Sequence, residues 1–79
     1  MLRISLFAGM AEAAGCRSVD VEWQGGTVGS LRAAVAKACP AAAPLIAVSA
    51  FAVGGRYSGD ADPVALDAEV AIIPPVSGG

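Results

Sequence analysis

Glu69-Val70-Ala71-Ile72-Ile73 is followed directly by Pro74-Pro75-Val76-Ser77-Gly78-Gly79 at the end of the sequence. The first five residues alternate and carry β-branched side chains, which is typical of a strand with Val70 and Ile72 on its core face. Proline fixes φ and has no backbone N–H, so the two prolines end the sheet pairing and stiffen the exit. We expect residues 74–79 to form a flexible tail whose glycines can enter a narrow channel in another protein. A frayed terminus without function is the plain alternative.

Alternating patterns elsewhere in the chain predict further strands of a mixed sheet. Leu2–Phe7 alternates with apolar residues on one face, and Val19–Trp23 alternates apolar with acidic side chains. A third strand is expected within Ile46–Val53, with Val48 as one of its markers, and residues 56–57 add a very short strand. A long crossover separates the first strand from the last, so these two strands can pair in parallel at the centre of the sheet.

One substantial helix is predicted between these strands. Thr27 is a candidate N-cap, and apolar residues then recur at helical spacing until Cys39, just before a proline. We expect a short helix at Ala8–Ala14, a loop at Ala41–Pro44 and one buried turn at Val64–Leu66. Together these patterns predict an α+β fold, a mixed sheet packed on one main helix, in a single domain over residues 1–79.

The composition excludes several classes of function. The 79 residues are 56% hydrophobic and 15% charged, with a net charge of −2, which indicates a globular chain without a basic surface for nucleic acid. No apolar run approaches the ~20 residues that a membrane-spanning helix needs. We therefore expect a cytoplasmic protein with neither nucleic acid nor a membrane as its partner.

The residues for self-contained catalysis or metal binding are missing from the sequence. It contains no histidine, and Cys16 and Cys39 stand far apart without the spacing of metal ligands. Asp60 and Asp62 have the spacing of a calcium loop, but the remaining ligands of such a loop are absent. The glycine pair at 25–26 fits neither phosphate-binding fingerprint. We expect no metal site, no bound cofactor and no autonomous active site.

The order of elements and the Gly-Gly end resemble the ubiquitin-like β-grasp proteins, and in particular the MoaD family of sulfur carriers, the small subunit of molybdopterin synthase. Three stretches carry the resemblance: Leu6-Phe7-Ala8 with Glu12 and Gly15, Ala52-Val53 with Asp62-Pro63 and Glu69-Val70, and Pro74-Pro75-Val76-Ser77-Gly78-Gly79. The last stretch is similar to that family's ending almost letter for letter. The chain departs from the family at Ala11, Gly54 and residues 66–68, which bears on partner affinity and turn geometry.

The resemblance implies that Gly79 carries the chemistry. An activating enzyme of the MoeB type would adenylate the Gly79 carboxylate with ATP and Mg²⁺, and sulfur from a persulfide donor protein would displace AMP to leave a thiocarboxylate. Bound to the large subunit, MoaE, this sulfur would attack the pterin precursor in molybdenum cofactor biosynthesis. The acid–base groups would belong to the partner, so the chain is a sulfur-donating subunit rather than an enzyme by itself.

The resemblance also implies which residues meet the partners. Gly78 would lie beside Gly79 without a side chain so that the tail fits the channel. The expected partner-binding residues, placed around the root of the tail and along it, are Phe7, Tyr57, Ile73, Pro74, Pro75, Val76 and Ser77.

Several alternatives share the same fold and ending. A ThiS-like carrier for thiamin synthesis, or a carrier for cysteine synthesis or tRNA thiolation, differs only in the pathway that it serves. A ubiquitin-like modifier would instead form isopeptide bonds to lysines. A protein-binding β-grasp module would use a tail without chemistry, and removing Gly78 and Gly79 would then change nothing.

Overall fold

The structure is a computed structural model that describes residues 1–75. Its main sheet has five strands in the order β2-β1-β7-β4-β5. These strands are β1 (Leu2–Leu6), β2 (Ser18–Val21), β4 (Ala50–Val53), β5 (Arg56–Ser58) and β7 (Val70–Ile73). A small second sheet pairs β3 (Gly26–Thr27) with β6 (Pro63–Val64). The helical segments are α1 (Gly9–Ala14), α2 (Val28–Ala38), the 3-10 turn η1 (Pro40–Ala42) and α3 (Ala43–Val48).

The last strand, β7, lies at the centre of the sheet. It pairs in parallel with β1, with Leu6 beside Ile72, and antiparallel with β4, with Ala50 opposite Ile73. The predicted parallel pairing of the first and last strands is therefore confirmed. Because both edges of β7 are hydrogen-bonded, the strand that leads to the tail is held on two sides.

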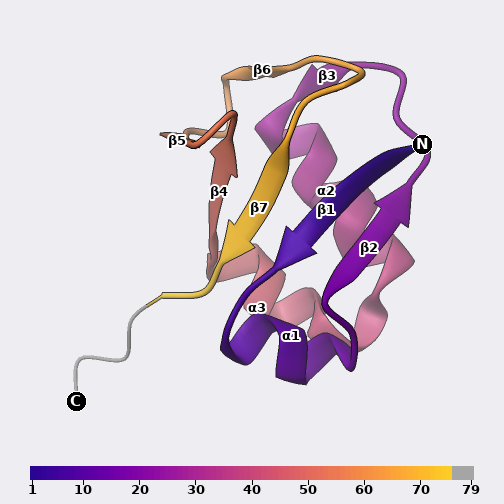
Figure 1. Cartoon of the computed structure of the whole chain (residues 1–79), viewed down its shortest axis with the longest axis vertical. Helices are drawn as coiled ribbons and strands as arrows, with labels where there is room; N and C mark the ends of the chain where they lie inside the picture. The colour runs from indigo at the N-terminus through magenta and orange to yellow at the C-terminus, as the bar shows by residue number, and fades with distance from the viewer. Residues whose placement is uncertain (76–79) are drawn as a thin grey trace.

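The helices cover one face of the sheet (Figure 1), with α2 behind the strands and α1 and α3 at the end where β7 leads out. Alternate residues of β1 and β7 face these helices and are buried, while the residues between them face away. The core unites strand and helix residues: Leu2, Ile4, Leu6, Met10, Val21, Val28, Leu31, Val35, Ala42, Ile46, Phe51, Val64, Val70 and Ile72.

The main helix, α2, begins and ends where the sequence predicts. Thr27 is its N-cap and accepts a hydrogen bond from the backbone N–H of Ser30, whose hydroxyl accepts in turn from the Thr27 N–H. This reciprocal pair satisfies two N–H groups that a helix start leaves unpaired. Cys39 is the C-cap, and its N–H donates to the carbonyl of Val35.

The segment after α2 corrects two predictions. The expected loop at Ala41–Pro44 is helical, because η1 and α3 run from Pro40 to Val48. Proline is tolerated in the first turn of a helix, where its missing N–H has no partner to lose, so Pro44 can stand in α3. The third strand consequently begins only at Ala50, and Val48 ends a helix instead of marking a strand. The fold thus has α2 as its main helix and two shorter helices beside it.

Two smaller predictions also change. The second strand is Ser18–Val21, so Glu22 and Trp23 lie beyond it. The expected buried turn at Val64–Leu66 is split: Val64 belongs to β6 and is buried, whereas Leu66 is exposed.

Within residues 1–75, no single helix is both long and apolar enough to cross a membrane. The helix α2 and the segment Pro40–Val48 reach that length only together, across a bend of 117°.

Candidate functional site

The root of the tail lies where β7 ends, between β1 and β4. On one side the N–H of Phe7 donates to the carbonyl of Ile72 over 3.4 Å, and on the other side Ile73 pairs with Ala50. Pro74 is half-buried and Pro75 is exposed. The chain therefore leaves the sheet from a fixed position, and the direction of its exit is set by two neighbouring strands.

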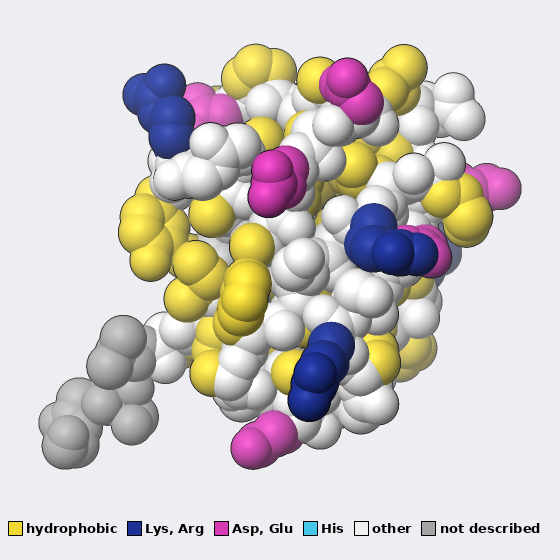
Figure 2. Space-filling model, in the orientation of Figure 1, with side chains coloured by type: hydrophobic (Ala, Val, Ile, Leu, Met, Phe, Trp, Pro, Cys, Tyr) yellow, Lys and Arg dark blue, Asp and Glu magenta, His cyan; other side chains and the backbone are white. Residues whose placement is uncertain are grey.

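The face of the sheet that the helices do not cover has a smooth centre. One row of paired residues crosses it from β1 to β5, and the first three have small side chains: Ser5, Ala71, Ala52 and Tyr57. The next row, toward the exit, contains Ile73 and Ala50. Figure 2 shows hydrophobic side chains gathered on this face near the place where the chain leaves. Such a flat, apolar face suits docking against another protein.

Exposed apolar side chains lie on both sides of β7. Phe7, which follows β1, is 52% exposed and Tyr57 of β5 is 73% exposed, so both are available to a partner. Ile73, another of the expected partner-binding residues, is half-buried and pairs with Ala50 of β4. We define the exit patch as Phe7, Val48, Tyr57 and Ile73.

Val48 is the member of the exit patch that the sequence analysis missed. It is 65% exposed and stands two residues before Ala50, which pairs with Ile73. Its β-branched side chain and its position in an apolar stretch predicted a buried strand residue. Recognising α3 first would have shown Val48 on the helix surface, since Ile46 is the residue of α3 that faces the core.

The predicted site residues Val76, Ser77, Gly78 and Gly79 lie outside the described residues. The roles expected for them in adenylation, sulfur transfer and channel binding remain predictions.

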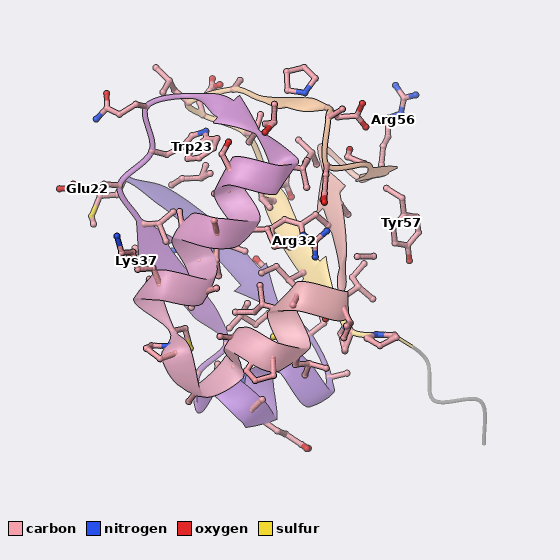
Figure 3. All side chains as sticks on the ribbon, turned by 180° about the vertical axis from the view of Figure 1, so that it is seen from behind. Glu22, Trp23, Arg32, Lys37, Arg56 and Tyr57 are labelled. Carbon is pink, nitrogen blue, oxygen red and sulfur yellow. The ribbon has the colours of Figure 1, made fainter. Side chains whose placement is uncertain are left out.

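Arg32 fixes the junction between α3 and β4 (Figure 3). Its guanidinium donates to the carbonyls of Ile46 at 2.8 Å and Ser49 at 2.7 Å. It also pairs with Asp60, with the Nη2–Oδ1 atoms 2.9 Å apart, and lies 4.7 Å from the ring centre of Phe51. The Ile46 carbonyl also accepts from the backbone N–H of Ser49 at 3.3 Å, so Arg32 adds a second, charged donor at the end of α3. The exit patch residue Val48 stands between Ile46 and Ser49 in the sequence, so these contacts fix the backbone on both sides of it.

Comparison with known proteins places the chain in a family. The ThiS family model matches residues 4–79. The chain belongs to the ThiS family. None of the curated proteins matches the sequence at a significant level.

Solved structures agree with this assignment. SAMP1 from Haloferax volcanii is 31% identical, with a TM-score of 0.84 over 99% of this chain and 98% of that chain. Another structure of small archaeal modifier protein 1 from H. volcanii is 29% identical, with a TM-score of 0.81 over 95% and 97%. A Pyrococcus furiosus protein described as a candidate molybdopterin converting factor, subunit 1, shares the fold at 23% identity, with a TM-score of 0.79 over 95% and 97%. The ubiquitin-like β-grasp fold is therefore confirmed, and the ThiS and MoaD sulfur-carrier fold is supported as a class, without MoaD being singled out.

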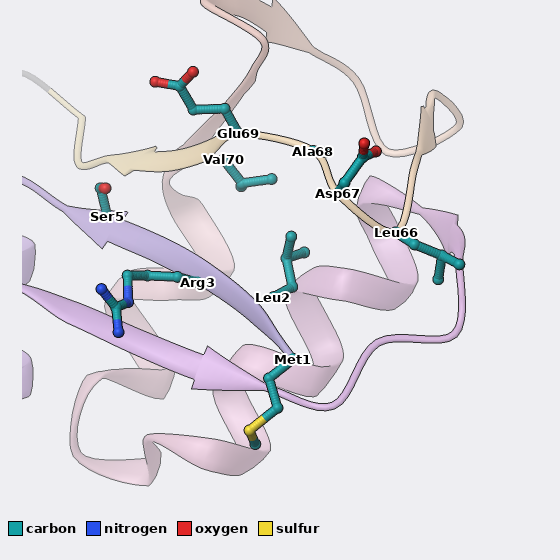
Figure 4. Close-up of a pocket in the computed structure, with 9 residues that line it drawn as sticks. All are labelled: Met1, Leu2, Arg3, Ser5, Leu66, Asp67, Ala68, Glu69 and Val70. Atoms are coloured by element: carbon teal, nitrogen blue, oxygen red, sulfur yellow. The ribbon is translucent and has the colours of Figure 1, made fainter.

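A hollow of this ThiS-family chain lies at the far end of the sheet from the exit. It has a volume of about 400 Å³ and lies between the start of β1 and residues 66–70. Its charged side chains, Arg3, Asp67 and Glu69, point in different directions (Figure 4), and Arg3 is paired with Asp20. Acid–base catalysis requires groups that converge on one point. This hollow lacks that arrangement.

The acidic pair in the β5–β6 loop has structural roles in the ThiS-family fold. The Asp60 carboxylate binds Arg32, and the backbone carbonyl of Asp60 accepts from the N–H of Gly29. The Asp62 carboxylate accepts from the N–H of Gly59, and the backbone carbonyl of Asp62 accepts from the N–H of Val28. The loop therefore holds the start of α2 through backbone contacts. Among residues 1–75, no three histidine, cysteine or acidic side chains come together as metal ligands.

Proposed function

We propose that this ThiS-family chain is a sulfur carrier whose Gly79 carboxylate is adenylated and then converted to a thiocarboxylate. The observation that carries the proposal is the position of β7, which is paired on both edges and leads the chain out beside the exit patch. A partner that binds this patch gains a fixed point at the end of β7, from which six more residues, spanning at most ~22 Å, extend to Gly79. Such a reach suits delivery of a chain end into an active-site channel.

The proposed reaction uses the partner's catalytic groups. The Gly79 carboxylate attacks the α-phosphate of ATP and releases pyrophosphate. A persulfide then displaces AMP from the acyl-adenylate, and a thiol cleaves the resulting acyl disulfide, which leaves the thiocarboxylate and a disulfide. A chain without histidine can serve in this scheme, because it contributes only the carboxyl group.

The sequence Pro74-Pro75-Val76-Ser77-Gly78-Gly79 favours the molybdopterin pathway within this class, because it resembles the ending of the MoaD family. We propose that the carrier acts as the small subunit of molybdopterin synthase and docks on a MoaE-type large subunit through the exit patch. The pathway is tested by copurification with that subunit. A stable complex with a thiamin-pathway partner instead would assign the carrier to the ThiS branch.

A side chain at Gly79 tests the carrier proposal. We expect Gly79→Val to abolish ATP–pyrophosphate exchange by a MoeB-type adenylating enzyme, because the added side chain blocks the channel. Its urea unfolding curve is expected to match that of the wild type, since the core residues in the described part of the chain lie within residues 2–72. Exchange at the wild-type rate would contradict the threading of this residue into an active site. Ala65→Val, a substitution at an exposed position outside the exit patch, is the matched control.

A second candidate function is that of a ubiquitin-like modifier. It is favoured by the similarity to small archaeal modifier protein 1 over nearly the whole length of both chains. A modifier forms the same acyl-adenylate, but its acyl group is transferred to lysine amines of target proteins and AMP is released. Isopeptide-linked conjugates that depend on Gly79 would indicate this function, whereas a thiocarboxylate without conjugates would indicate the carrier.

A further inference from the structure

Lys37 is the only lysine of the sequence; the other four basic residues are arginines. An activated C-terminal acyl group reacts with amines, and the guanidinium of arginine stays protonated and is not an acceptor. A second copy of this chain can therefore offer an activated Gly79 only one side-chain amine. The backbone amine of Met1 is the one other candidate in the sequence.

The structure leaves Lys37 open to attack. It stands in the last turn of α2, where its side chain is exposed. The two ion pairs among residues 1–75 are formed by Arg3 and Arg32, so within this part of the chain no carboxylate holds the Lys37 amine. The buried residues of α2 are on its other side, so the reaction of this amine would not disturb the core.

Lys37 also lies away from the surface that we assign to the partner. Figure 3 shows it on the helix side of the molecule, at the opposite side from Tyr57 of the exit patch. A copy of the chain that is docked through its exit patch therefore keeps Lys37 uncovered. The same copy can act as donor through Gly79 and as acceptor through Lys37.

The Met1 amine is the weaker acceptor on steric grounds. It belongs to the residue immediately before β1, so the body of the sheet must approach the donor site with it. The Lys37 amine stands on a four-carbon stem and can enter a narrow channel where an acyl-adenylate is held.

We propose that Lys37 is a conjugation site, at which Gly79 of a second copy forms an isopeptide bond. This inference rests on the proposed activation of Gly79. The Lys37 Nζ attacks the acyl-adenylate carbonyl, the C–N bond forms, the C–O bond to AMP breaks, and the amine proton passes to solvent. Since Lys37 is the only lysine of the sequence, its isopeptide-linked products are chains with a single type of linkage.

The test incubates the full-length protein with a MoeB-type adenylating enzyme, ATP and Mg²⁺ in the absence of a sulfur donor. Pyrophosphate exchange is measured first, because its absence refutes the proposed activation and the conjugation with it. With exchange established, we expect a dimer that resists hydroxylamine and whose peptide map joins Gly79 to Lys37. Lys37→Arg keeps the charge at the end of α2 and is expected to lower dimer yield at least tenfold while pyrophosphate exchange is unchanged. A dimer joined through Met1, an undiminished yield in Lys37→Arg, or exchange without any dimer would overturn the proposal.

Discussion

Arg32→Met isolates the contribution of the clamp that joins α2 to α3 and β4. Methionine keeps an unbranched stem of similar length over Phe51 and removes every donor. The lost interactions are two hydrogen bonds from a charged donor to the carbonyls of Ile46 and Ser49, the contact with the Phe51 ring, and the ion pair with Asp60.

The magnitude follows from how exposed each interaction is. The Arg32 side chain is 21% exposed, so water can in part replace it at the two carbonyls, and each hydrogen bond contributes about 1 kcal/mol, less than the ~1.5–3 kcal/mol typical of a bond with a charged group. The ring contact adds about 0.5 kcal/mol. The ion pair adds about 0.5 kcal/mol, because Asp60 is 65% exposed. The sum is about 3 kcal/mol, most of the ~3–5 kcal/mol expected for a domain of this size.

Urea unfolding followed by fluorescence provides the assay, because Trp23 is the single tryptophan and its indole N–H donates to the carbonyl of Val64. With an m-value of about 1 kcal/mol per M, a loss of about 3 kcal/mol should lower the midpoint by about 3 M. Arg3→Met is the matched control: its ion pair with Asp20 is exposed at both ends, 74% and 46%, and its loss should cost less than about 1 kcal/mol. Equal losses in the two variants, or a loss below about 1 kcal/mol in Arg32→Met, would refute the reasoning.

Three further substitutions probe the cap, the backbone and the exit patch. Thr27→Ala removes the hydrogen bonds with Ser30 and should lower the free energy of unfolding by about 1 kcal/mol; an unchanged urea midpoint would contradict this. Ala8 has φ 50° and ψ −129°, a region that suits glycine, so Ala8→Gly should raise stability by about 1 kcal/mol and a decrease would exclude strain there. Tyr57→Asp should abolish copurification with the MoaE-type large subunit. It should change the free energy of unfolding by less than about 0.5 kcal/mol, since the side chain is 73% exposed. Retained binding would show that Tyr57 is not part of the docking surface.

The elements predicted well from the sequence are those whose signals are local. Residues 69–73 alternate with β-branched side chains, and Val70 and Ile72 are both in the core. The start of α2 was readable because Thr27 is itself the capping group. The central place of β7 followed from the long crossover between the first and last strands.

The element that the sequence concealed, α3, depends on contacts that are distant in the chain. Its six residues include Pro44, Ile46 and Val48, which do not favour a helix by themselves. The structure stabilises it through the buried Ile46 and through Arg32, fourteen residues before Ile46, which caps its final carbonyls. A short helix of this kind is set by tertiary packing, which no local pattern contains.

In the candidate site too, some features follow from local sequence signals and others depend on contacts that are distant in the chain. Phe7 is exposed because strand alternation places it opposite the buried Leu6, a pattern that is visible in the sequence. The sequence did not predict that Val48 is exposed, because its pattern indicated a strand where the structure has α3. The partial burial of Ile73 depends on its pairing with Ala50 across β4, a register that the sequence alone did not give.

The intact mass of the full-length protein, after coexpression with a MoeB-type adenylating enzyme and a persulfide sulfur donor, tests the central claim most directly. A sulfur carrier should yield a species heavier by one oxygen-to-sulfur exchange, with fragment ions that place the sulfur at Gly79. The Gly79 deletion variant should stay unmodified under the same conditions. An unmodified wild-type mass, obtained where a known carrier is loaded in parallel, would contradict the sulfur-carrier function.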